Sequence, residues 1–259
     1  MKLKIVPART GVLWVKLGIR TFFRQPLALS GLFLMFMVIT WLAGSVPVVG
    51  PALVLALLPA CTLGFMAACK EADTGKFPMP AVFFSAFRAG RQQVRAMLVL
   101  GVLYGLGLWM ITGVTALFDN GAFVARHMAG QMPTVEMVQD PATKTAILVF
   151  LALQLPLSLM FWHAPALVHW HQVPPLKSMF FSLVACLRNF WAYTLFGLAW
   201  MGVALGTLLF LVLLASLAGS PQLLGVVLPP VLMLIASMVL SSTYFTFRDC
   251  FDTSTGETA

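Results

Sequence analysis

Charged residues are scarce in this chain of 259 residues: they make up 9% of it, whereas hydrophobic residues make up 60%. An ordinary soluble domain carries about 25% charged residues. Asp, Glu, Lys and Arg are all absent from four long stretches, at residues 25–69, 96–118, 145–176 and 189–247. The composition therefore excludes an ordinary soluble domain and indicates a membrane protein.

The lengths of these stretches, 45, 23, 32 and 59 residues, indicate how often the chain crosses the membrane. One crossing takes roughly 20 apolar residues. The two longest stretches therefore hold two crossings each, and the other two hold one each. We predict an all-α, polytopic transmembrane helical bundle of six helices, near residues 27–44, 52–69, 97–117, 147–169, 191–218 and 223–247.

Motifs for catalysis and for metal or cofactor binding are also absent. The chain contains no HExxH, no GxSxG and no phosphate-binding loop. Its four cysteines form no CxxC pair, so we expect free thiols that pack as small apolar residues. We predict no catalytic residue, no cofactor and no metal ligand, and hence a protein that is not an enzyme.

The fourth predicted crossing is unusual because it carries polar side chains at Gln154, Ser158 and His163, followed by histidines at 169 and 171. Metal binding is disfavoured, because positions 163 and 169 lie about 240° apart around a helix. No acidic residue or cysteine is near enough in sequence to complete a metal site. We interpret Gln154, Ser158 and His163 as a candidate polar site, which serves either helix packing or a substrate.

Positive charge is strongly one-sided. In the six-helix arrangement, 14 of the 16 Lys and Arg residues lie on the side that holds both termini, and only Arg126 and Lys144 lie on the other. Basic loops stay on the cytoplasmic side, so we predict a multi-pass protein of the bacterial inner membrane with cytoplasmic N- and C-termini. The formal net charge of +8 predicts membrane lipids, including anionic ones, as partners and no nucleic acid.

Three similar segments, here called elbows, precede the three helix pairs. The first elbow ends near residue 24, the second covers 80–95 and the third covers 175–188. Each is basic and contains two adjacent phenylalanines. Their patterns predict amphipathic interfacial helices, with apolar residues toward the acyl chains and basic residues toward the head groups. We predict one membrane domain over 1–259 with three repeats, at 10–69, 78–169 and 172–247. Candidate head-group contacts are Arg88, Arg91, Arg95, Lys177 and Arg188.

Two GxxxG patterns occur, one at Gly101 and Gly105 and the other at Gly202 and Gly206. Such glycines let two helix backbones approach closely. We expect both patterns to make contacts inside the fold rather than between subunits.

Several stretches resemble a family of bacterial inner-membrane proteins that is described only by its six transmembrane helices. They are FWHAPALV at 161–168, VPPLKSMFFS at 173–182, ACLRN at 185–189, IVPAR at 5–9 and FFRQP at 22–26. More distantly, the chain is similar to YciC-like proteins and to the membrane domain of some glycerophosphodiester phosphodiesterases. The resemblance implies a location and a topology but no catalytic residue, because the barrel of those phosphodiesterases is absent.

The sequence leaves two functions open. The first is a non-enzymatic envelope protein that binds lipid or a protein partner through its elbows. The alternative is a small-molecule or lipid transporter that uses the polar, proline-kinked fourth helix. A polar cavity at mid-membrane beside Gln154 and His163 would favour transport, whereas basic grooves at the cytoplasmic interface would favour the first function.

Overall fold

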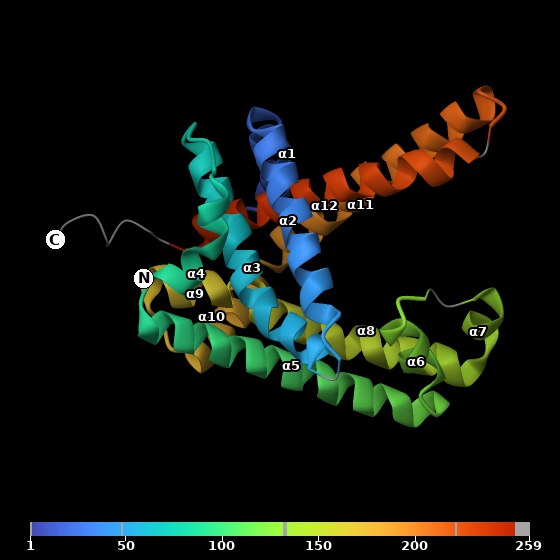
Figure 1. The fold of residues 1–259 in the computed structure, drawn as a ribbon, viewed down its shortest axis with the longest axis horizontal. Helices are drawn as coiled ribbons and strands as arrows, with labels where there is room; N and C mark the ends of the chain where they lie inside the picture. The colour runs from blue at the N-terminus through green and yellow to red at the C-terminus, as the bar shows by residue number, and fades with distance from the viewer. Residues whose placement is uncertain (1, 48, 132–133, 221, 252–259) are drawn as a thin grey trace.

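The computed structural model describes residues 2–47, 49–131, 134–220 and 222–251, and this part of the chain is helical almost throughout (Figure 1). It contains no strand there, apart from an isolated bridge between Leu3 and Phe251. The elements are α1 (Thr10–Arg24), α2 (Pro26–Gly44), α3 (Gly50–Asp73), the 3-10 helix η1 (Pro80–Phe84), α4 (Ser85–Arg88), α5 (Arg91–Asp119), α6 (Ala122–Met128), α7 (Val135–Gln139), α8 (Pro141–Trp162), α9 (Ala164–His171), α10 (Pro175–Arg188), α11 (Phe190–Leu217) and α12 (Gln222–Cys250).

Six helical segments of the described chain are long and apolar enough to cross a membrane. They are α2, α3, α5, the pair α8 and α9, α11, and α12. Each overlaps one of the six predicted crossings, which confirms the predicted all-α, multi-pass architecture.

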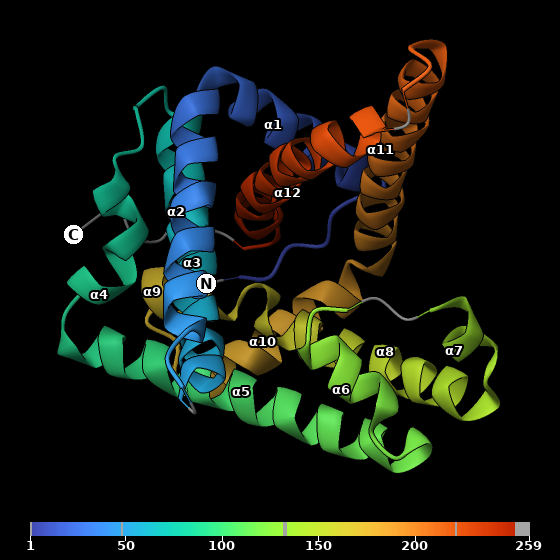
Figure 2. The same cartoon turned by 45° about the vertical axis from the view of Figure 1, so that its right-hand side comes forward.

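The six crossings pack as three hairpins, formed by α2 with α3, α5 with α8, and α11 with α12. The hairpins point in different directions (Figures 1 and 2). Helix α3 is the most enclosed crossing, with half of its most apolar window buried, whereas the corresponding share is 6% in α12. Much of the apolar surface is therefore left to face lipid.

Each elbow packs mainly against a hairpin other than the one it leads into. Elements η1 and α4 lie on α3, and α10 lies on α8 and α9. Helix α1 has no hairpin before it and lies on α11 and α12, at the other end of the chain (Figure 2). The three hairpins and their elbows thus close into a ring, while the threefold repeat of the sequence itself stays a prediction.

Helix α10 turns its small side chains inward and its large apolar ones outward. Ser178, Ser182 and Ala185 are fully buried against the protein, whereas Leu176 and Phe180 are 69% and 60% exposed. An apolar face directed away from the protein fits a helix that rests on the acyl chains of a membrane. Leu176 and Phe180, on the predicted apolar face of this elbow, are therefore not packed against the protein, and their contact with lipid stays a prediction.

The prediction of one continuous helix over 80–95 is wrong. The chain breaks at Gly90, whose φ of +101° and ψ of 161° is a conformation that glycine alone adopts readily. As a consequence, Arg91 and Arg95 belong to the first turns of α5, and only η1 and α4 form the second elbow.

The two GxxxG patterns behave differently. A Cβ atom on Gly101 would lie 2.2 Å from the carbonyl oxygen of Ala56 in α3, so this glycine makes the close contact expected of it. The expectation for Gly202 and Gly206 is wrong, because a Cβ atom there would meet nothing within 4 Å. Instead, the close approach to α11 occurs at Gly11 of α1. A Cβ atom on Gly11 would lie 2.0 Å from the carbonyl oxygen of Ala192 in α11.

Candidate functional site

A basic cavity of about 620 Å³ lies where the end of α3, the second elbow and α9 come together. We call it the basic pocket. Its polar lining consists of Lys70, Glu71, Lys76, Ser85, Arg88 and His169, and the remaining lining includes Trp170 and several small apolar side chains.

Three local features of the sequence build this pocket. Helix α3 passes from apolar to charged residues in its last turn, and the Lys76 amide then donates to the Glu71 carbonyl (3.0 Å), which folds the following loop back. Gly64 lets η1 lie directly on α3, since a Cβ atom there would be 2.7 Å from the Phe83 carbonyl oxygen. The elbow therefore presents Ser85 and Arg88 toward the same space.

The charges of the pocket are not neutralised by neighbouring side chains. Lys70, Lys76 and Arg88 face a single acid, Glu71, and no ion pair joins any of these four within the described chain. The Lys70 ammonium lies 5.6 Å from the centre of the Trp170 ring, within the range of a cation–π interaction. The lining thus carries two net positive charges.

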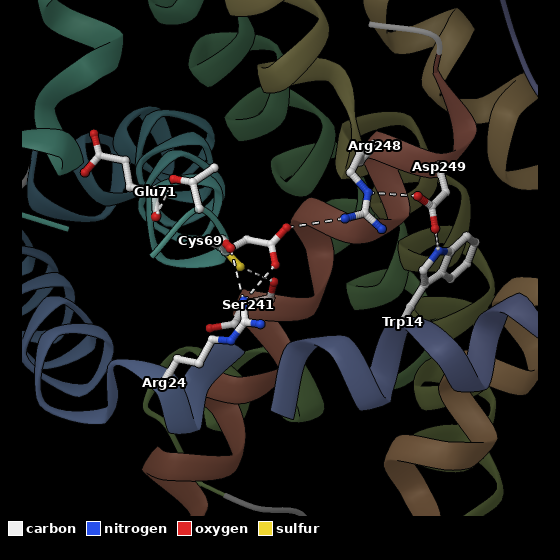
Figure 3. A network of polar contacts seen from close by, with 9 residues as sticks. Trp14, Arg24, Cys69, Glu71, Ser241, Arg248 and Asp249 are labelled. Carbon is white, nitrogen blue, oxygen red and sulfur yellow. Dashed lines mark hydrogen bonds and ion pairs between the residues drawn. The ribbon is translucent and has the colours of Figure 1, made fainter. Parts of the chain in front are cut away.

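Two further acidic side chains, Asp73 and Asp249, are already paired with residues outside the basic pocket. Asp73 accepts from Arg24 and from Arg248, each at 3.4 Å, and Asp249 accepts from Arg248 and from the Trp14 indole, each at 2.9 Å (Figure 3). This network ties α1, α3 and α12 together, and Glu71 points away from it (Figure 3). It therefore supplies no counter-charge to the basic pocket.

Two buried polar atoms of the pocket lining have no hydrogen-bond partner, namely Ser85 Oγ and His169 Nδ1. An unpaired buried polar atom costs about 1–3 kcal/mol. One of these atoms lies on α4 and the other on α9, so each of these two elements carries a buried polar atom without a partner beside the pocket.

The three predicted site residues of the fourth crossing line neither of the two cavities described in this structure. The Gln154 side-chain amide donates to Ser158 Oγ at 3.5 Å, while Gln154 Oε1 is buried without a partner. His163 is fully buried, and its Nε2 pairs with the Tyr193 hydroxyl. Neither the basic pocket nor a second, apolar cavity of about 200 Å³ between α11 and α12 borders any of them.

A hydroxyl from α10 bridges the break between α8 and α9. The His163 amide donates to Ser182 Oγ (2.9 Å), and the Ser182 hydroxyl donates to the Leu159 carbonyl (2.7 Å). Ser182 thus replaces the backbone bond that would join these two residues in a regular helix. The Cys186 thiol lies 3.9 Å from the same carbonyl, and burial raises the pKa of this thiol to about 12, which keeps it protonated as a donor.

A second polar cluster joins both ends of the chain to the third elbow. The Asn189 side chain accepts from the Val6 amide (2.8 Å) and donates to the Lys4 carbonyl (3.1 Å). The Lys4 amide in turn donates to the Cys250 carbonyl (2.9 Å). These bonds hold the segment before α1 between α10 and the end of α12.

Only one of the predicted head-group contacts lines the basic pocket. Arg88 is part of it, whereas Arg91, Arg95, Lys177 and Arg188 are exposed elsewhere. Lys70, Lys76, Ser85 and His169 were not expected to share a site, because the sequence does not show that α9 folds onto α3 and α4. Their basic or interfacial character was the only available signal.

The cysteines and histidines form no evident metal site in the described part of the chain. All four cysteines are buried and free. No group of three or more His, Cys, Asp or Glu side chains there could hold a metal ion.

Six apolar crossings, interfacial elbows and a basic pocket at the ends of the crossings define a multi-pass α-helical membrane protein. The chain is 37% identical over 254 residues to a probable inner membrane protein of Burkholderia thailandensis, and the match covers 97% of this chain and 94% of that relative. The chain belongs to this family of inner membrane proteins, which confirms the predicted location. No protein-family model and no solved structure matches it.

Proposed function

We propose that this inner-membrane protein binds the head groups of anionic phospholipids in the basic pocket and has no enzymatic activity. The observation that carries the proposal is a 620 Å³ cavity lined by three basic side chains and one acid, without ion pairs among them. Basic pockets between membrane helices suit anionic head groups, and each basic residue near the surface contributes about 1 kcal/mol.

The position of the pocket supports a lipid rather than a fully soluble ligand. It lies at the last turns of α3 and α9, where two crossings end. Trp170, of the type enriched at membrane interfaces, lies in its wall. Phe84 and Phe87 of the second elbow are 41% and 38% exposed, so the elbow that carries Ser85 and Arg88 also exposes apolar side chains, as the binding of an amphiphile requires.

The proposal includes the orientation of the protein. The basic pocket lies on the side that holds 14 of the 16 basic residues, and basic loops stay in the cytoplasm. We therefore place the pocket and both termini at the cytoplasmic leaflet.

The test compares two triple variants of the full chain in mild detergent. Retention of phosphatidylglycerol against phosphatidylcholine is measured by native mass spectrometry during lipid titration. Replacing Lys70, Lys76 and Arg88 by glutamine should weaken retention of phosphatidylglycerol by about 100-fold, the equivalent of three contributions of about 1 kcal/mol.

The matched control replaces Arg91, Arg95 and Lys177 by glutamine. It removes the same charge from exposed positions on the same side of the protein, outside the pocket. We expect its effect to be less than tenfold. Equal losses in the two triple variants would show that general surface charge, rather than the pocket, attracts the lipid.

The alternative function is transport of a small molecule or lipid through the fourth crossing. One observation favours it, namely the buried and unpaired Gln154 Oε1. Under transport, replacing Gln154 and His163 together by alanine should abolish complementation of a deletion strain. Under lipid binding, the pocket triple variant should lose complementation while a correctly folded double variant keeps it.

The sequence also predicts that a protein partner binds at the exposed basic residues of the elbows. The more distant likeness to YciC-like proteins and to the membrane domains of glycerophosphodiester phosphodiesterases also stays a prediction from the sequence. Co-purification in mild detergent, with identification of bound lipids and proteins, addresses the partner directly.

A further inference from the structure

The size of the basic pocket argues against a single phosphate group as its whole ligand. At about 30 Å³ per heavy atom, the share of one water molecule, a phosphate of five heavy atoms occupies about 150 Å³. That is roughly a quarter of the 620 Å³ available. Two phosphates joined by a glycerol, with 14 heavy atoms, occupy about 420 Å³ on the same scale.

The charge of the pocket argues against a head group with one negative charge. Lys70, Lys76 and Arg88 outnumber Glu71 by two charges, and Asp73 is already paired with Arg24 and Arg248. Lys70, Lys76 and Arg88 are exposed, and an excess of positive charge at a membrane surface attracts a ligand of matching negative charge. Phosphatidylglycerol neutralises one of the two charges, whereas phosphatidic acid neutralises up to two but is too small.

The polar groups of the pocket are also distributed over several walls. Lys70 comes from the last turn of α3, Lys76 from the loop that follows α3, and Arg88 from α4. A single phosphate in one corner leaves some of these groups without a partner. Two phosphates held apart by a short linker supply acceptor oxygens to more than one wall.

We infer that the head group bound in the basic pocket carries two phosphates, as in cardiolipin; this inference rests on the proposed lipid-binding function. Such a head group matches both the volume of the basic pocket and its two excess positive charges. The lipid source is preferred over a soluble diphosphate because the elbow that carries Arg88 also exposes two apolar side chains, Phe84 and Phe87.

The experiment titrates the detergent-solubilised full chain with cardiolipin, phosphatidylglycerol and phosphatidic acid, with phosphatidylglycerol at twice the molar concentration so that phosphate is equal. We expect cardiolipin to bind about fivefold more tightly than phosphatidylglycerol, as for one further basic residue engaged. Replacing Arg88 by glutamine removes one charge and should bring this ratio close to one. Arg91→Gln, which lies outside the pocket, should keep the ratio.

The possible failures are distinguishable. Equal binding of phosphatidylglycerol and cardiolipin, or tighter binding of phosphatidic acid, overturns the two-phosphate head group and leaves the lipid-binding function intact. Displacement of cardiolipin by millimolar inorganic diphosphate overturns the lipid as the source. Retention of no anionic lipid at all overturns the proposed function itself.

Discussion

Replacing Ser182 by alanine tests whether its hydroxyl holds the fourth crossing together. The side chain is fully buried, accepts from the His163 amide and donates to the Leu159 carbonyl. Alanine keeps the Cβ atom and removes only the hydroxyl. Both backbone groups then lose this partner in a buried place.

The expected loss follows from those two groups. A buried polar group left unpaired costs about 1–3 kcal/mol, and the Cys186 thiol at 3.9 Å gives the Leu159 carbonyl a weak substitute. We therefore expect the free energy of unfolding to fall by about 2–4 kcal/mol. At about 2–4 °C per kcal/mol for a chain of this size, the midpoint of thermal unfolding should fall by about 4–16 °C.

The assay is thermal unfolding in detergent, followed by circular dichroism and by size-exclusion chromatography after heating. Ser178→Ala is the matched control, because Ser178 is equally buried in the same helix but donates only to the Pro175 carbonyl of that helix (2.7 Å). Its unfolding midpoint should change much less. If the two variants unfold at the same temperature, the bridging role of Ser182 is refuted.

Three further predictions concern packing, the buried histidine and the orientation. Gly101→Ala should lower stability by about 1–3 kcal/mol because of its clash with α3, whereas Gly202→Ala should be neutral or stabilising; thermal unfolding of both variants decides this. Tyr193→Phe removes the partner of His163 Nε2 and should lower the free energy of unfolding by about 1–3 kcal/mol, which denaturant titration measures. Alkaline phosphatase fused after Gly130 should be active and after Lys76 inactive; the opposite pattern refutes a cytoplasmic pocket.

The crossings were predictable because a crossing is a local property of the sequence. Twenty apolar residues without charge are sufficient to define one, and α2 begins and ends within one residue of the predicted 27–44. The third elbow was predictable for the same reason, since the pattern over 175–188 belongs to one helix.

Contacts between elements were much harder to predict from the sequence. Nothing near Ser182 in the sequence indicates that it bonds the backbone at Leu159, and nothing near His169 indicates that it lines the same pocket as Arg88. The GxxxG pattern at Gly202 shows the same limit, because two glycines permit a close approach without specifying a partner. Gly90 differs, since a glycine inside a helical pattern is itself a local signal of a break.

The position of α1 has a consequence for how the molecule is assembled. This helix leaves the ribosome well before the surfaces on which it packs, α11 and α12. The bonds that join Lys4 to Asn189 and Cys250 require the same late partners. The first elbow can therefore dock only after the six crossings that follow it have been made, so its docking comes late in the assembly of the molecule.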